Sequence, residues 1–205
     1  MLGAGSGCFD ASTMDLRRLA KYLPLLAAAA VLALPTAASA HLTPKCKNRN
    51  TPATRISAKA MRKAVVCLVN KQRSERGLPP LSESGRLDRS AQGWSNWMVR
   101  AASFTHGGNF TGRLSAVGYN WSAAGENIAS GFSTPWAVMK GWMGSPDHCR
   151  NILSPQFHDI GVGVNSHRLG FYGPSTWTQD FGLWMGHHAP SGNGGPQNGC
   201  PYRIY

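Results

Sequence analysis

The chain has 205 residues, with 21 Lys and Arg against 9 Asp and Glu, and a formal net charge of +12 at pH 7. Once an N-terminal signal segment is set aside, this length suits one domain whose core does not depend on disulfides for folding. The charge indicates either contact with an anionic surface or a solvated, soluble face, and both interpretations stay open. A nucleic acid partner is not expected, because no nucleic-acid-binding motif accompanies the charge.

Residues 1–40 have the pattern of an N-terminal extension followed by a secretory signal peptide. Basic residues at positions 17–21 precede an apolar run, and Ala38-Ser39-Ala40 supplies the small residues of a cleavage site. The signal has the usual length when it is counted from Met14, so we expect translation to start there. The apolar run is too short to cross a bilayer, and nothing later in the chain is as apolar. We therefore expect a secreted protein without a membrane span.

Helices are predicted to dominate the first half of the mature chain. Residues 41–57 read as an irregular arm, because they are rich in proline and polar residues. A first helix is expected from about Ser57, where apolar residues recur at helical spacing up to the stop at Gly77. The same spacing predicts a second helix from near Ser84. His106 falls just after the end of that helix.

The middle of the chain is expected to combine short helices with a strand. Residues 111–117 can form a short helix, and residues 125–129 read as a strand because they are too few and too flanked by glycine for a helix. Ser133 is the predicted cap of the next helix. Another short helix begins at Ser145-Pro146, since serine caps and proline fits the first position, and it carries His148.

Two strands are predicted near the end of the chain. Residues 157–164 alternate apolar side chains with glycines, which suggests that another backbone packs closely there. Residues 177–182 read as a further strand. Helices first and strands later indicate an α+β fold, in which helices cover a sheet. The tail, residues 186–205, is rich in Gly, Pro and Asn, and we expect a bridge at Cys200 to hold it.

Four cysteines remain once the signal segment is removed, and we expect two disulfides. An even number in an oxidising compartment favours bridges over metal thiolates, and no CxxC pair is present. Sequence alone permits three pairings. Cys67 lies in an apolar helical pattern and Cys149 directly follows His148, whereas Cys46 and Cys200 lie in polar ends. Pairing like with like predicts Cys67 with Cys149 and Cys46 with Cys200.

Two histidines and a glutamate are the candidates for chemistry. His106, Glu126 and His148 could hold a divalent cation or move a proton. They come from three separate elements, so their spacing does not show that they meet. Each also has a structural explanation, since His106 can donate to free helix carbonyls, Glu126 can accept from backbone amides and His148 can cap its own helix. The tryptophans at positions 94, 97, 136, 142 and 184 are interpreted as core and cleft wall rather than as a carbohydrate platform.

Ordered sequence blocks extend over nearly all of residues 60–183. They read CLVNKQR at 67–73, GLPPL at 77–81, SFTH at 103–106, GENIA at 125–129, WMGSPDH at 142–148, NIL at 151–153, IGVGV at 160–164 and WTQDFG at 177–182. In order and spacing these blocks resemble the CAP superfamily of cysteine-rich secretory proteins, insect venom antigens and plant pathogenesis-related proteins, in its bacterial secreted branch. On this resemblance we assign residues 58–185 to a CAP-like domain.

The resemblance implies a three-layer α-β-α sandwich and a shallow cleft in which two histidines and two glutamates converge, in some members around a divalent cation. His106 and His148 then become candidate ligands of a metal such as zinc, and Glu126 the first of the two acids. The second acid is missing. Many members have Glu three residues after the helix tryptophan, whereas counting from Trp142 gives Ser145. Glu126 cannot easily be both a firm ligand and a free base.

We therefore expect a secreted, monomeric binding module rather than an enzyme, with a cleft that takes up a divalent metal while its imidazoles are neutral. Because the family includes members that carry sterols or other lipids, an apolar or lipid ligand is a second expected partner. One alternative is adhesion to anionic envelope polymers through the basic half between Lys45 and Arg100. Another is a metal-assisted hydrolase or protease, with Glu126 as the base and His106 and His148 as ligands.

Overall fold

The computed structural model describes residues 45–189, 195 and 199–201. The predicted signal peptide with its start at Met14, the first residues of the predicted arm and most of the predicted tail lie outside the described residues. No helix in the described part of the chain is both long enough and apolar enough to cross a bilayer.

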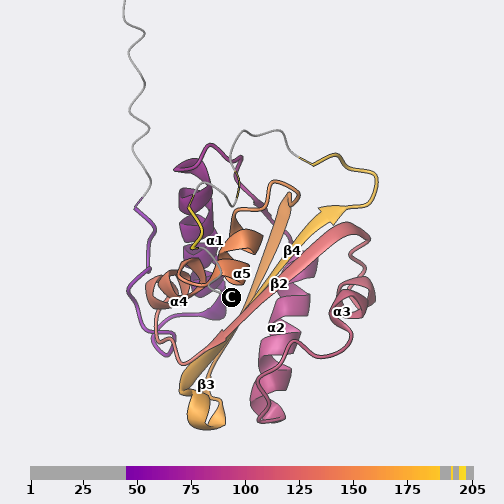
Figure 1. Ribbon diagram of the computed structural model, residues 1–205. Helices are drawn as coiled ribbons and strands as arrows, with labels where there is room; N and C mark the ends of the chain where they lie inside the picture. Colours follow the sequence, from indigo (N-terminus) through magenta and orange to yellow (C-terminus); the bar gives the residue numbers. More distant parts are fainter. Residues whose placement is uncertain (1–44, 190–194, 196–198, 202–205) are drawn as a thin grey trace, which may run out of the picture. The chain divides into compact units, whose positions relative to one another are not determined.

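The described residues form five α-helices, a short 3-10 helix and four strands (Figure 1). The helices are α1 (Ala58–Ser74), α2 (Gly85–Arg100), α3 (Phe110–Ala116), α4 (Pro135–Met143), α5 (Pro146–Ile152) and the 3-10 helix η2 (Gly170–Tyr172). The strands are β1 (Ser82–Glu83), β2 (Trp121–Ser130), β3 (Asp159–Arg168) and β4 (Pro174–Trp184). The predicted helices and strands are all present, and only the two-residue strand β1 and η2 were not predicted from the sequence.

The helices start where the sequence predicted, but two of the predicted caps need correction. Helix α1 starts after Ser57, as predicted, and the side chain of Ser57 caps it by accepting a hydrogen bond from the amide of Ala60 at 3.2 Å. The predicted cap of α4 is wrong by one residue, because Thr134 and not Ser133 accepts from the amide of Ala137, at 3.1 Å. Ser145 occupies the N-cap position of α5, but its side chain makes no capping hydrogen bond.

The sheet has the strand order β1-β3-β4-β2. The pairing of β1 with β3 is parallel, and the two other pairings are antiparallel. In this register Glu126 of β2 lies opposite Asp180 of β4, and Asp180 lies opposite Gly161 of β3. The three residues therefore share one face of the sheet. Strand β2 lies at the edge of the sheet, and it contacts α3 as well as α4 and α5.

Helix α2 packs against one face of the sheet, and glycines on β3 allow its close approach. A Cβ atom added to Gly161 would lie 2.1 Å from the carbonyl carbon of Leu87, and one added to Gly163 would lie 2.2 Å from that of Ala91. The alternation of glycine with apolar residues therefore places small residues under the α2 backbone and apolar side chains on the other face. This confirms the predicted backbone approach.

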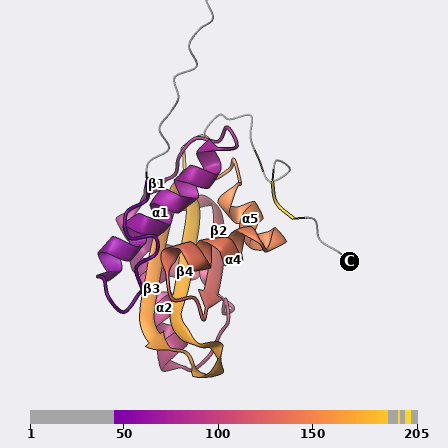
Figure 2. The ribbon, with the colours of Figure 1, turned by 90° about the vertical axis from the view of Figure 1, so that its left-hand side faces the viewer.

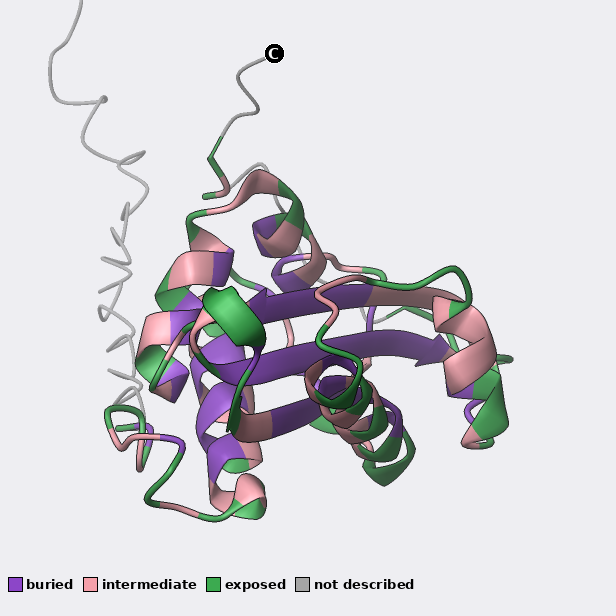
Figure 3. Cartoon of the chain, turned by 90° about the horizontal axis from the view of Figure 1, so that it is seen from below, coloured by how far each residue is buried: buried purple, intermediate pink, exposed green. Residues whose placement is uncertain are grey.

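Helices α1, α4 and α5 cover the opposite face. The main core cluster joins Val65 and Leu68 of α1 and Trp142 of α4 to Val162 and Phe181 of the sheet. Figure 2 shows α1 and α4 in front of the strands and α2 behind them, and Figure 3 shows the strands as a buried layer between helices with exposed outer faces. The domain is thus the α+β, three-layer α-β-α sandwich that the sequence predicted, and it has two disulfides.

The predicted pairing of the cysteines is wrong. The bridges join Cys46 to Cys67 and Cys149 to Cys200, and each pair has a Cα–Cα distance of 5.6 Å, which is normal for a disulfide. Each bridge fastens a segment from one end of the domain to a helix, α1 in the first case and α5 in the second. The local environment of each cysteine could not reveal this, because the pairing depends on where the end segments run.

Candidate functional site

Two of the three candidate residues, His106 and Glu126, contact each other at the β2 edge of the sheet, and His148 lies on a helix that is hydrogen-bonded to the same strand. His106 lies in the loop between α2 and α3, Glu126 lies in β2, and His148 lies in α5. The side chain of Glu126 is 3% exposed, whereas that of His106 is 52% exposed. The carboxylate of Glu126 is therefore buried in the site, and the imidazole of His106 is the part of this pair that solvent can reach.

Both carboxylate oxygens of Glu126 are occupied. Oε1 accepts from Nδ1 of His106 at 2.8 Å, and Oε2 is paired with the guanidinium of Arg113 from α3. Because a carboxylate paired with arginine only accepts hydrogen bonds, Nδ1 of His106 carries the proton. In the neutral ring Nε2 then has the free lone pair. Glu126 thus orients His106, in the way that a carboxylate orients a ligating histidine in metal proteins.

Arg113 also fixes the loop that carries His106. Its guanidinium donates to the carbonyl of His106 at 2.9 Å and lies 3.7 Å from the centre of the Trp94 ring. The indole N–H of Trp94 donates to the carbonyl of Thr105 at 3.0 Å. The role of Arg113 was not predicted, because no local pattern distinguishes it from the other basic residues of this chain.

His148 enters the site from the opposite layer and is neutral at neutral pH. Burial lowers the pKa of His148, and the nearby charge of His106 lowers it further, while Asp147 acts weakly in the opposite direction. The backbone carbonyl of His148 accepts from the side-chain amide of Asn127 at 3.0 Å, which fastens α5 to β2.

Asn151 completes the attachment of α5 to β2. Its side-chain amide donates to the carbonyl of Glu126 at 3.1 Å and to Oδ1 of Asn127 at 2.9 Å. Asn127 and Asn151 belong to the GENIA and NIL blocks, so these blocks position the two candidate elements against each other. Both blocks were recognised in the sequence, but this role of their asparagines was not predicted.

A second carboxyl group lies behind Glu126, although Ser145 takes the place of the expected second acid. Asp180 is opposite Glu126 in the register of β2 and β4 and has no exposed surface. Burial, and next the charge of Glu126, raise the pKa of Asp180 well above its usual range. Because its carboxyl group has no contact with solvent, it cannot serve as a base in the cleft. This residue lies inside the WTQDFG block, but it was not among the predicted site residues.

The arrangement does not provide three metal ligands. The described residues contain no group of three or more His, Cys, Asp and Glu side chains that could hold a metal ion. Glu126 is engaged by His106 and Arg113, so only Nε2 of His106 and the imidazole of His148 remain as donors. Structural zinc sites in proteins use four ligands and catalytic sites use three with a water. The predicted set of His106, Glu126 and His148 is thus not supported as a ligand triad, and zinc uptake stays a prediction.

Known sequences resemble this chain over most of its length. Residues 66–181 match the model of CAP, the cysteine-rich secretory protein family. The chain is 38% identical over 150 residues to the uncharacterized protein YkwD of Bacillus subtilis, an alignment that covers 71% of this chain and 56% of YkwD. It is 30% identical over 107 residues to the uncharacterized membrane protein YlbC of the same organism, which covers 50% of this chain and 31% of YlbC. The chain therefore spans little more than half of one relative and about a third of the other.

Solved structures share the fold. An extracellular protein of Bacillus anthracis with an SCP domain has a TM-score of 0.55 at 29% identity, over 62% of this chain and 44% of that chain. An outer surface protein of Borrelia burgdorferi has a TM-score of 0.57 at 19% identity, over 63% of this chain and 97% of that chain, a likeness of fold alone. With the family model matching more than half of its residues, the chain belongs to the CAP, or cysteine-rich secretory protein, family.

Proposed function

We propose that this chain is an extracellular binding module that holds its ligand through the two imidazoles at the β2 edge and does not hydrolyse it. The observation that carries this proposal is the state of Glu126, whose buried carboxylate is paired at both oxygens. A general base needs a free acceptor within reach of the proton that it removes. Neither the paired Glu126 nor the fully buried Asp180 offers one, so binding is favoured over hydrolysis or proteolysis.

Two features support an extracellular location. The described domain contains two disulfides, which persist in oxidising compartments outside the cytoplasm. The similar structures include one described as an extracellular protein and one described as an outer surface protein. Both features agree with the signal peptide that residues 1–40 predict.

A divalent metal such as zinc is the first ligand to test. His106 and His148 would hold it, and Glu126 would keep Nε2 of His106 directed outward through the hydrogen bond to Nδ1. Two imidazoles without a carboxylate predict weaker uptake than a complete site of three or four ligands. Uptake should fall as the pH drops through the histidine range, because protonated imidazole has no free lone pair.

Calorimetry with zinc on the tag-free protein tests this proposal. We expect binding at neutral pH that disappears in the variant with both His106→Gln and His148→Gln. The matched control is His187→Gln with His188→Gln, an exposed pair outside the cleft, which should leave the cleft binding unchanged. Uptake that survives the loss of both cleft histidines would remove the proposal.

Two other readouts separate the rival functions. Turnover of a peptide or ester substrate that is lost with Glu126→Gln, in a variant that remains folded, would favour the hydrolase. Binding to an anionic envelope polymer that weakens steeply with salt and ignores the histidines would favour adhesion.

A further inference from the structure

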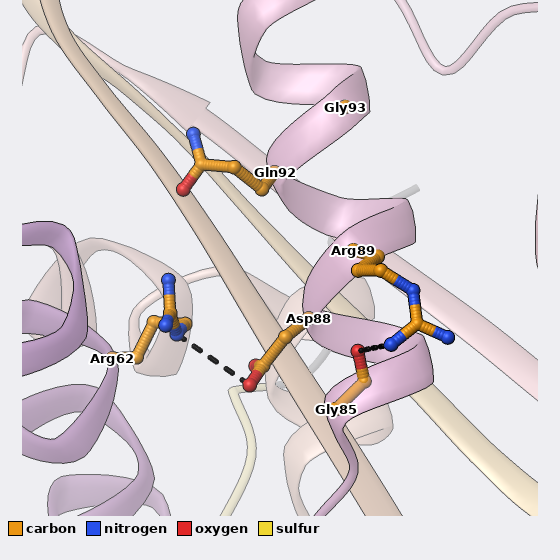
Figure 4. Close-up of a pocket in the computed structure, with 6 residues that line it drawn as sticks. All are labelled: Arg62, Gly85, Asp88, Arg89, Gln92 and Gly93. Carbon is orange, nitrogen blue, oxygen red and sulfur yellow. Dashed lines mark hydrogen bonds and ion pairs between the residues drawn. The ribbon is translucent and has the colours of Figure 1, made fainter. Parts of the chain in front are cut away.

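Two pockets flank α2, and they differ in how their charges are compensated. The first has a volume of about 370 Å³ and lies where Arg62 of α1 faces residues of α2 (Figure 4). Its acidic residue, Asp88, is paired with Arg62 at 3.5 Å and accepts from the amide of Val162 at 2.9 Å. The charges of Arg62 and Asp88 therefore offset each other, which leaves Arg89 as the one unpaired charge among the described residues that line this pocket.

The second pocket, of about 340 Å³, is lined by residues of α2 and of the α3 segment. Three arginines, Arg89, Arg100 and Arg113, line it together with Trp94 and Trp97. Its remaining lining residues are small or apolar, and none of the described lining residues is acidic. Its volume is at the lower end of the range of pockets that hold small molecules.

Aromatic rings form a flat wall in this pocket. Trp94 and Trp97 are one helical turn apart on α2, and their rings stack with centroids 4.4 Å apart and planes inclined by 5°. The guanidinium of Arg113 lies against Trp94, and Trp97 is 38% exposed. Trp97 is therefore the outermost layer of a three-membered stack, and it offers a surface on which a ligand ring could stack.

Two of the three positive charges have no counter-ion in the described part of the chain. Arg113 is neutralised by Glu126. Arg89 donates to the carbonyls of Gly85 and Val117, which are neutral acceptors and leave its charge uncompensated. The side chain of Arg100, at the end of α2, makes no hydrogen bond or ion pair with the described residues. A carboxylate or sulfonate could accept hydrogen bonds from the guanidinium of Arg100, whereas that of Arg89 is turned toward the start of α2.

We propose that the pocket between α2 and α3 binds a small organic anion with a flat apolar ring. The ring stacks on Trp97, and the anionic group pairs with Arg100, which lies one helical turn further along α2. This site is separate from the imidazole cleft, but Arg113 belongs to both, because it lines the pocket and holds Glu126. Variants at Arg113 would disturb both sites, so the test uses other residues.

Calorimetry with 2-naphthoate and with the uncharged 2-naphthalenemethanol tests the proposal. The two probes share a ring system and differ in charge. Arg100→Gln should weaken naphthoate binding about tenfold, as expected for the loss of one charge-assisted hydrogen bond, and should leave binding of the alcohol unchanged. Trp97→Ala should weaken both probes. Arg55→Gln removes the same charge from an exposed site outside the pocket and should change neither.

The proposal is overturned if naphthoate does not bind, if it binds no better than the alcohol, or if Arg100→Gln and Arg55→Gln behave alike. Far-ultraviolet circular dichroism on each variant checks that the helices persist. Should Trp97→Ala fail to fold, Trp97→Leu keeps an apolar side chain without the ring and is expected to weaken both probes in the same way. The zinc titration of the cleft is expected to be unaffected by Arg100→Gln, so failure of this proposal and failure of the proposed cleft function are distinguishable.

Discussion

Glu126 stabilises the domain through its two partners, and its neutral isostere should therefore be costly. In Glu126→Gln the guanidinium of Arg113, 18% exposed, loses its counter-charge, and a largely buried charge without a partner is strongly unfavourable. We expect a loss of about 2 to 3 kcal/mol in the free energy of unfolding, measured by urea denaturation at pH 7.

The matched control for this change is Glu75→Gln. Glu75 is a surface carboxylate, 41% exposed, that pairs with Lys71 at 3.9 Å and with Arg76 at 3.8 Å. Exposed ion pairs contribute little, so this substitution should change stability by less than about 1 kcal/mol. Equal effects of the two substitutions would show that the pairing of Glu126 with Arg113 does not stabilise the fold.

His148 should make the stability of the domain depend on pH. Its folded-state pKa is lowered, so between that value and the ordinary value near 6.5 the unfolded chain binds more protons than the folded one. Stability is then lost as the pH falls through this window and is regained as the pH rises above it. His148→Gln removes the titrating group, so the variant should lose less stability than the wild type between about pH 7 and pH 5.

Urea denaturation at several pH values measures this difference. His167→Gln, a substitution of an exposed histidine, should follow the wild-type curve. If the curves of the wild type and His148→Gln run parallel, the burial of the neutral imidazole does not contribute to the pH dependence.

At the scale of residues, the groups with distinctive chemistry could be predicted from the sequence, whereas those whose role depends on tertiary contact could not. The meeting of His106 with Glu126 followed from the family resemblance and not from spacing. Arg113 and Asp180 matter because the fold brings them to Glu126, and a single arginine or aspartate carries no local signal of that kind. The sequence showed that Ser145 replaces the expected second glutamate, but it did not show that the carboxyl group of Asp180 is buried next to Glu126.

At the scale of elements, the spacing of apolar residues, together with the capping residues, glycines and prolines at the ends of elements, was sufficient to predict the helices and the long strands. They failed where the signal was short. Strand β1 has two exposed residues and is fixed by its pairing with β3, so no periodicity could reveal it. Two adjacent hydroxyl residues precede Pro135, and the choice between Ser133 and Thr134 as the cap depends on backbone geometry that the sequence does not specify.

The contact of α2 with β3 should be intolerant of even one added methyl group. The Cβ of Gly163→Ala would fall 2.2 Å from the carbonyl carbon of Ala91, which is helix backbone and cannot move alone. We expect a loss of about 2 to 3 kcal/mol in the free energy of unfolding, near the upper end of the cost of overpacking a core. Thermal and urea denaturation measure it.

The control adds the same methyl group to helix α2 instead of strand β3. Gly93 lies within α2, and an added Cβ there meets nothing within 4 Å. Gly93→Ala should stabilise the domain by about 0.5 to 1 kcal/mol, because alanine restricts the unfolded chain and favours the helix. A destabilised Gly93→Ala or a neutral Gly163→Ala would contradict this packing of α2 on the sheet.

At the scale of the whole molecule, each of the two disulfides joins a segment near one end of the described domain to a helix. The bridge between Cys46 and Cys67 closes a loop of 21 positions along the chain, and that between Cys149 and Cys200 closes one of 51. The four participants could be identified from the sequence, but their partners could not. Composition and redox compartment determine whether cysteines pair, whereas the path of the chain determines which ones meet.

The lengths of the two loops predict which disulfide contributes more to the stability of the domain. Replacing both cysteines of a bridge with serine raises the conformational entropy of the unfolded chain. In the chain-entropy treatment this lowers the free energy of unfolding by about 3 kcal/mol for the shorter loop and by about 4 kcal/mol for the longer one. We therefore expect the variant without Cys149 and Cys200 to unfold at lower urea than the variant without Cys46 and Cys67, and the fully reduced protein to be less stable than either. The opposite order would mean that packing of the residues around Cys46, itself buried, outweighs the loop entropy of the longer bridge.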